Sequence, residues 1–368
     1  MLMNRLSAID AFAPAFARVR AMLFHPFRLG TWLKMGLIGL LGGGAIVSSG
    51  GSNFRAPVMP RNLPHGDLPP NAEDILRAIR SIHLADYFHV IVIVIGVIVA
   101  FALIFLYLFC RFRFILFDSV VAGQPEIERG WLKYESQANR YFGFWLAFRL
   151  VTWGALFLIV GVPLWKAYKS GIFSGDNSLP IFFAMIASVA LGALIVGIAF
   201  AIISTLAKDF VMPVMALDDL SVGDAWSAVW RVAASEPGAW AGYMGMKLLC
   251  AIGSSIALTI AFFIAAIPAF ILIGIPVGIL ALLGVLAFKA IGAVFGIIIF
   301  CVAVLLAAAG FICLLLILTA PISVFFTSYA LYFFGGRYPK LAALLSPQPI
   351  PPAPISPIAG TQPVPQGP

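Results

Sequence analysis

The sequence predicts an all-α protein, a polytopic bundle of about six transmembrane helices. Composition is the first reason, because 62% of the 368 residues are hydrophobic and 10% are charged, whereas soluble domains carry about 25% charged residues. Continuity is the second, because between residues 238 and 318 the only charges are those of Lys247 and Lys289. A chain of this composition is expected to bury its side chains in lipid.

A helix needs about 20 mostly apolar residues to cross a hydrocarbon core roughly 30 Å thick. The segments that meet this requirement are 29–48, 88–109, 141–165, 181–206, 238 to about 263, and 290–318. A possible seventh hydrophobic segment, 265–288, contains Pro268 and Pro276. Prolines remove backbone hydrogen bonds that lipid cannot replace, which favours a broken or re-entrant helix there.

Residues 1–346 are expected to form a single integral membrane domain with an internal repeat. The repeat units cover about 88–165 and 181–263, with partial copies at both ends. In each unit a span leads to a short segment that contains an acidic residue, then to an amphipathic helix and to a new span. Ser221 has the features of a helix N-cap, with Asp224 three residues further on.

Three helical stripes of apolar residues have the spacing of amphipathic helices lying on the membrane surface. The stripes are Phe12, Phe16, Val19 and Leu23; Ile127, Trp131, Tyr134 and Ala138; and Val222, Trp226, Val229 and Ala233. The predicted interfacial anchors are Trp32, Trp131, Trp145, Trp226 and Trp240. Segment 50–72 is expected to form an external Pro/Gly-rich loop, and 347–368 a disordered Pro-rich tail.

The basic residues predict a multi-pass protein of the cell (cytoplasmic) membrane with a cytoplasmic N-terminus. Arg5, Arg18, Arg20 and Arg28 precede the first span against one acid, Asp10, and cytoplasmic segments are enriched in such residues. The net charge of +8 favours membrane lipids as partners rather than nucleic acid, because no basic soluble domain is present. The Pro-rich tail is either a ligand for a protein partner or a solvated extension. The sequence leaves homo-oligomerisation open.

Several motifs resemble those of an uncharacterised family of archaeal and bacterial polytopic membrane proteins. They are segment 209–219 followed by Trp226 and Trp240, segment 142–149, and segment 26–32. The resemblance extends from about residue 11 to residue 338. The repeat is also distantly similar to the membrane domain of glycerophosphoryl diester phosphodiesterases. These resemblances imply a membrane fold and topology but no activity.

Charges at membrane depth are the candidate ligand or lipid-head-group residues, because such charges are costly unless they are paired. Arg149 and Lys247 lie inside equivalent spans, and Asp118, Asp209 and Asp218 lie in the acidic segments at the same level. The alternative is that the two basic side chains reach the interface or form structural ion pairs. No catalytic, cofactor or metal motif is found. His83, Asp86 and His89 recur within two helical turns, which is consistent with a metal site that includes His65 but is better explained by a solvated helix face.

Three classes of function remain open. A non-enzymatic protein that organises or binds lipids or partner proteins is favoured by the interfacial helices, and its sharper form places a lipid groove beneath the helices that carry Trp131 and Trp226. A transporter or channel is the alternative, favoured by the repeat and by the interrupted segment 265–288. A membrane-embedded lipid-modifying enzyme is the third, and it requires Asp118, Asp209, Asp218 and Asp219 to converge.

Overall fold

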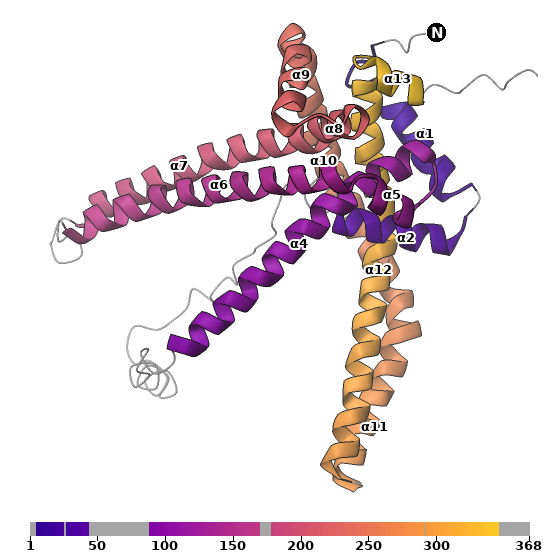
Figure 1. The fold of residues 1–368 in the computed structure, drawn as a ribbon. Coiled ribbons are helices and arrows are strands. Elements are labelled where there is room, and N and C mark those ends of the chain that lie inside the picture. Colours follow the sequence, from indigo (N-terminus) through magenta and orange to yellow (C-terminus); the bar gives the residue numbers. More distant parts are fainter. Residues whose placement is uncertain (1–4, 26, 44–87, 170–177, 291, 346–368) are drawn as a thin grey trace, which may run out of the picture.

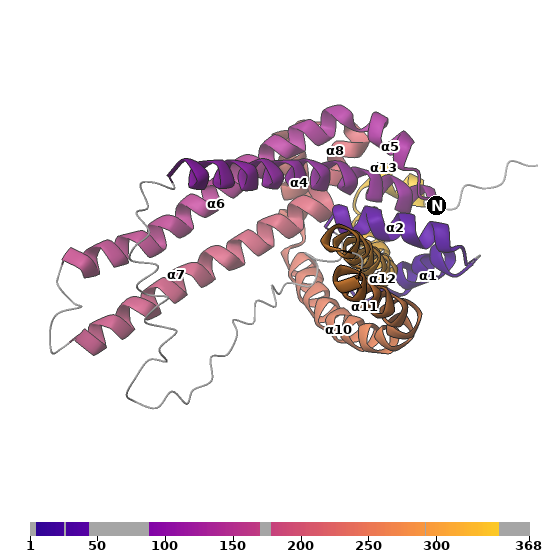
Figure 2. The ribbon, with the colours of Figure 1, turned by 90° about the horizontal axis from the view of Figure 1, so that it is seen from below.

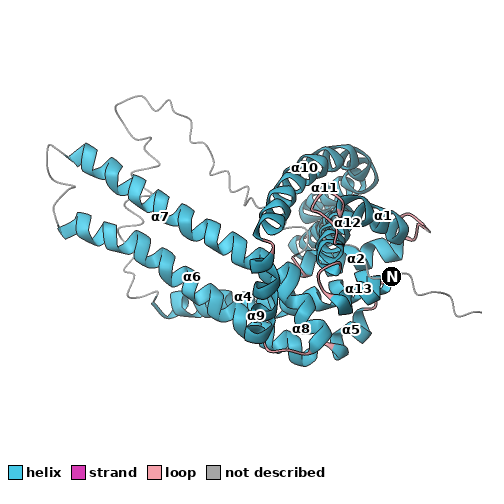
Figure 3. Ribbon diagram, turned by 90° about the horizontal axis from the view of Figure 1, so that it is seen from above, coloured by secondary structure: helices cyan, strands magenta, loops and turns pink. Residues whose placement is uncertain are grey.

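The computed structural model describes residues 5–25, 27–43, 88–169, 178–290 and 292–345. Every regular element in these ranges is a helix (Figure 3), which confirms the predicted class. The elements are α1 (Phe12–Leu23), α2 (Leu29–Leu41), α4 (Phe88–Ala122), α5 (Ile127–Lys133), α6 (Glu135–Lys169), α7 (Ser178–Leu206), the π-helical η2 (Ala207–Val211), α8 (Met212–Asp218), α9 (Val222–Ser235), α10 (Pro237–Ala269), the π-helical η3 (Phe270–Gly274), α11 (Ile275–Ala290), α12 (Ala293–Gly335) and α13 (Pro339–Leu345). The predicted loop 50–72 and tail 347–368 lie outside the described residues.

The helices pack together in one region, which we call the hub. It comprises α1, α2, residues 110–120 of α4, residues 207–215 of η2 and α8, residues 319–335 of α12, and the first turns of α6 and α10. From the hub, α4, the α6–α7 pair and the α11–α12 pair extend in different directions (Figures 1 and 2). Most buried side chains belong to the hub, so the core of the fold lies at one end of the long helices.

Within the described residues, five helices are long and apolar enough to cross a membrane. They are Phe88–Ala122, Glu135–Lys169, Phe183–Asp218, Pro237–Ala290 and Ala293–Gly335, and they correspond to five of the six predicted spans. Almost no residue in their most apolar stretches is buried within the chain. Such surfaces require an apolar environment, so these helices suggest a multi-pass membrane protein. The predicted compartment and orientation stay predictions.

The first segment predicted to cross the membrane, 29–48, forms a shorter helix than predicted. Helix α2 ends at Leu41 after 13 residues, which rise about 20 Å and fall short of a hydrocarbon core of roughly 30 Å. Gly43 has a φ of 67°, the left-handed conformation that commonly ends helices at glycine. Residues 44–48 lie outside the described part of the chain. Helix α2 packs along α12 instead of standing alone as a span.

The segment 265–288 is helical throughout, which corrects the expectation of a broken helix drawn from its prolines, whereas a re-entrant path stays a prediction. One helix runs from Pro237 to Ala290 and passes through the π-helical turn η3 just after Pro268. A π turn relieves the strain that proline introduces into a helix. The chain then reverses at Gly292, whose φ of 130° suits only glycine, and α12 returns beside α11 (Figure 1). A π-helical turn thus stands where the sequence predicts a break.

The predicted amphipathic stripes pack against the hub. The Ser221 Oγ accepts a hydrogen bond from the Asp224 backbone N–H at 3.2 Å, which confirms the N-cap of α9. Val229 of α9, Tyr134 before α6 and Val19 of α1 are all buried. Burial against protein therefore accounts for much of the apolar spacing that predicted helices on the membrane surface.

Replacing Gly36 by alanine should lower stability by about 1–3 kcal/mol, the usual cost of overpacking. A Cβ at Gly36 would lie 2.1 Å from the Leu316 carbonyl oxygen, so α2 and α12 would have to separate. Gly96→Ala is the matched control, because a Cβ there meets nothing within 4 Å. The thermal unfolding midpoint in one detergent should fall for Gly36→Ala alone. Equal midpoints for the two variants would contradict the close packing.

Candidate functional site

A single carboxylate, that of Asp209, connects three segments of the hub. Its Oδ1 accepts a hydrogen bond from Arg113 Nη2 of α4 at 3.3 Å. Its Oδ2 accepts one from the Tyr243 hydroxyl of α10 at 2.8 Å and is ion-paired with Lys247 Nζ, also of α10. The side chains of Asp209, Arg113 and Lys247 are only 2%, 6% and 11% exposed. We call these four residues the Asp209 cluster.

Aromatic rings pack next to the Asp209 cluster and give it an apolar environment. The Phe210 ring lies 4.5 Å from that of Trp240 and 5.0 Å from that of Tyr243, between ring centroids. Tyr243 also stacks on Tyr329 of α12 at 5.2 Å. Ion pairs in such a low-dielectric environment are stronger than in water, and an unpaired charge there is more costly.

The other predicted carboxylates belong to separate ion pairs. Asp118 Oδ1 accepts hydrogen bonds from Lys133 Nζ and from the Tyr134 hydroxyl, each at 2.8 Å. Asp218 is paired with Lys340.

Asp219 is likewise paired elsewhere, with Arg140. Each of the four carboxylates therefore has a basic partner of its own. Among the described residues no group of three or more His, Cys, Asp or Glu side chains has the arrangement of a metal site. His65, His83 and Asp86 lie outside those residues.

The two predicted basic residues have different surroundings. Lys247 is paired with Asp209, whereas Arg149 is exposed and forms no ion pair within the described residues. Arg149 lines a cleft of about 270 Å³ between α6 and α7.

Sequence reasoning missed Arg113, Tyr243 and Lys208 as site residues. A signal for Arg113 exists, because it is a basic residue just after the apolar run 88–109, and a charge at that depth needs a partner.

The predicted anchors divide into core residues and half-buried residues. Trp145 and Trp240 are 2% and 6% exposed, so they belong to the aromatic core instead of a surface. Trp32 is also buried, and its Nε1 donates to the Leu23 carbonyl at 2.6 Å. Trp131 and Trp226 are half-buried against the hub. Placement of these two at a membrane surface stays a prediction.

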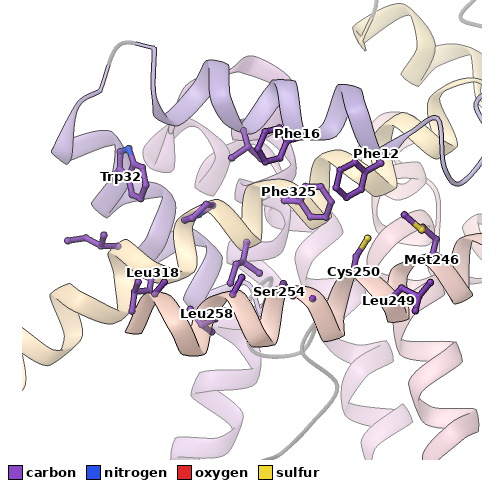
Figure 4. A pocket seen from close by; sticks show the side chains of 17 residues that line it. Phe12, Phe16, Trp32, Met246, Leu249, Cys250, Ser254, Leu258, Leu318 and Phe325 are labelled. Atoms are coloured by element: carbon purple, nitrogen blue, oxygen red, sulfur yellow. The ribbon is translucent and has the colours of Figure 1, made fainter. Parts of the chain in front are cut away.

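An apolar groove of about 800 Å³ lies between α1, α10 and α12 (Figure 4). Its lining residues are Phe12, Phe16, Val19, Trp32, Met246, Leu249, Cys250, Gly253, Ser254, Ala257, Leu258, Ala261, Ile317, Leu318, Pro321, Ile322 and Phe325. Neither Trp131 nor Trp226 lines it, so this groove differs in position from the predicted one. The N-terminal stripe contributes Phe12, Phe16 and Val19, of which Phe12 is 40% and Phe16 59% exposed.

Replacing Asp209 by asparagine should lower stability by about 3–5 kcal/mol, because it leaves Arg113 and Lys247 buried without a counter-charge. Asp219→Asn is the control. The Asp219–Arg140 pair is exposed, with side chains 65% and 36% accessible, and such pairs contribute about 0–1 kcal/mol. Unfolding midpoints in the same detergent would measure the difference. A loss for Asp209→Asn no larger than that of the control would contradict a stabilising cluster.

The second electrostatic prediction concerns Tyr134, which lies between α5 and α6. Burial, reinforced by the Asp118 carboxylate, raises the pKa of the Tyr134 hydroxyl to about 12. The unfolded chain ionises near pH 10, so the folded state holds this proton more tightly. Stability should therefore fall as pH rises from about 10 to 12.

An ultraviolet difference titration of the protein against Tyr134→Phe would measure this ionisation. A midpoint near 10 in the folded protein would contradict the burial of this hydroxyl.

The comparisons with known proteins give a family without an assigned activity. No curated protein and no solved structure matches the chain, and no link to the membrane domain of glycerophosphoryl diester phosphodiesterases is shown. A family of unknown function, DUF7544, matches residues 6–344, a range that includes the whole hub and the long helices. The chain therefore belongs to the family of unknown function DUF7544.

Proposed function

We propose that the protein is a non-enzymatic membrane protein that binds lipid, with an acyl chain in the groove between α1, α10 and α12. The observation that carries the proposal is the apolar lining of this groove. The Ser254 hydroxyl donates to the Ala251 carbonyl, and the Trp32 indole N–H donates to the Leu23 carbonyl. Both polar groups are thus already satisfied, and a hydrocarbon chain is the ligand that such walls favour.

The dimensions of the groove support an acyl chain as its occupant. Helix α10 lines it from Met246 to Ala261, a rise of about 22 Å. One leaflet of a bilayer contributes about half of a hydrocarbon core roughly 30 Å thick. The groove is therefore long enough for one lipid tail. Its walls α10 and α12 belong to candidate spans, so lipid is the apolar molecule in greatest supply around it.

The separate ion pairs of the four carboxylates support the non-enzymatic part of the proposal. Asp118, Asp209, Asp218 and Asp219 each contact a different basic residue, and acid–base chemistry on a lipid would need at least two of them together. We keep the cytoplasmic membrane as the proposed location. Binding of a protein partner by the Pro-rich tail 347–368 also remains a proposal.

Photo-crosslinking tests the groove directly. The probe is a phosphatidylcholine with a diazirine near the end of one acyl chain, added to the purified protein in detergent. Peptide mass spectrometry should find the label on residues 246–261 of α10 and 317–325 of α12. Gly253→Phe should remove most of this label, because the new ring fills the groove.

Gly245→Phe is the matched control, because Gly245 lies on the same helix, is exposed and does not line the groove. Neither position has an atom within 4 Å of an added Cβ, so both variants should fold. Labelling spread evenly over all the exposed helices would contradict the proposal. Equal labelling of the two variants would contradict it as well.

A further inference from the structure

Buried cations outnumber buried carboxylates around Asp209. Lys208 is 5% exposed, and the side chains of Arg113 and Lys247 are 6% and 11% exposed. Within the described residues, the charges that act most strongly on Lys208 are those of Lys247, Arg113, Asp209 and Arg149, and of these only Asp209 is acidic. Three buried basic groups thus share a single acidic one.

The Asp209 carboxylate is already occupied by other donors. Its Oδ1 accepts from Arg113, and its Oδ2 accepts from Tyr243 and Lys247. Within the described residues, the Lys208 amine has no ion pair or hydrogen bond. The Arg113 Nε is a fully buried donor without an acceptor within the described residues. A buried charge without a partner is unfavourable, and an anion would supply acceptors to these donors.

We propose that a phosphate group binds beside Lys208, with Arg113 and Arg149 as its further basic contacts. Phosphate supplies several acceptor oxygens and more than one negative charge, which lysine and arginine recognise by charge-assisted hydrogen bonds. A bound phosphate would neutralise the positive charge that the single Asp209 carboxylate does not balance.

The position of these residues along the spans fits this ligand. Arg113 follows the apolar run 88–109 and Lys208 follows the apolar run 181–206, so both lie where a hydrocarbon core ends and lipid phosphates begin. The cleft of about 270 Å³ between α6 and α7 is lined by Arg149, which is also an electrostatic neighbour of Lys208.

The phosphate has two possible sources, a lipid head group and free phosphate. Protein stripped of lipid in a maltoside detergent, without phosphate buffer, would be titrated in parallel with inorganic phosphate and with phosphatidylglycerol. The source that is bound should raise the thermal unfolding midpoint, because a ligand of the folded state stabilises it. Native mass spectrometry should then show one adduct per chain. The absence of a midpoint shift with both probes would overturn the proposal.

Substitutions locate the binding at Lys208. Lys208→Met should raise the midpoint without ligand, since it removes an unpaired buried charge, and should weaken phosphate binding by at least about tenfold. Lys340→Met is the control, because Lys340 is a 66% exposed partner of Asp218, and its affinity should match the wild type.

Arg149→Gln is a second variant, at an exposed position where folding should be unaffected. It too should weaken binding by about tenfold, and it decides the question if Lys208→Met does not fold. Unchanged affinity in the folded variants would overturn the site. The outcome is independent of the acyl-chain proposal, because the groove between α1, α10 and α12 contains none of these three basic residues.

Discussion

The pairing of charge where water is scarce constrains this fold more than any other interaction. Asp209 receives donors from Arg113 of α4 and from Tyr243 and Lys247 of α10. One carboxylate thereby fixes η2 between helices that come from both repeat units. Moving any of these segments away would leave a charge buried without its partner, which costs far more than the loss of an exposed pair. The hub is therefore held at one point from which the apolar helices extend.

The long helices outside the hub are held together differently. Apolar side chains gain little from one another when lipid is the alternative, so close approach of small residues becomes important. An added Cβ at Gly192 would lie 2.9 Å from Ile159 between α7 and α6, and one at Gly296 would lie 2.4 Å from Phe288 between α12 and α11. The groove forms where α10 leaves α12, beyond the Tyr243–Tyr329 stack. Ion pairs and hydrogen bonds thus hold the hub together, and small residues allow the long helices to pack closely in pairs.

The sequence predicts what composition and local patterns decide. Five long helices follow from apolar length alone, and the Ser221 cap is a local feature. The choice of partners is not local. Lys247 and Asp209 are predictable as candidates because charges at that depth need partners, yet the selection of Arg113 in place of Arg149 depends on how α4 crosses η2. The burial of Trp145 is equally invisible, since the same spacing serves a membrane surface and a protein core.

The two predicted repeat units differ at positions that form the cluster. With Trp145 aligned on Trp240, Tyr243 and Lys247 correspond to Phe148 and Thr152 of the first unit. In the same alignment, Lys208 corresponds to Arg113. The first unit therefore contributes Arg113, and the second contributes the carboxylate and two lysines. If the two repeat units had the same residues at these positions, like charges would face each other. An ion pair between the units therefore requires that their sequences differ. In this alignment Asp209 corresponds to Phe114, so the carboxylate that both Arg113 and Lys247 contact occurs in the second unit alone.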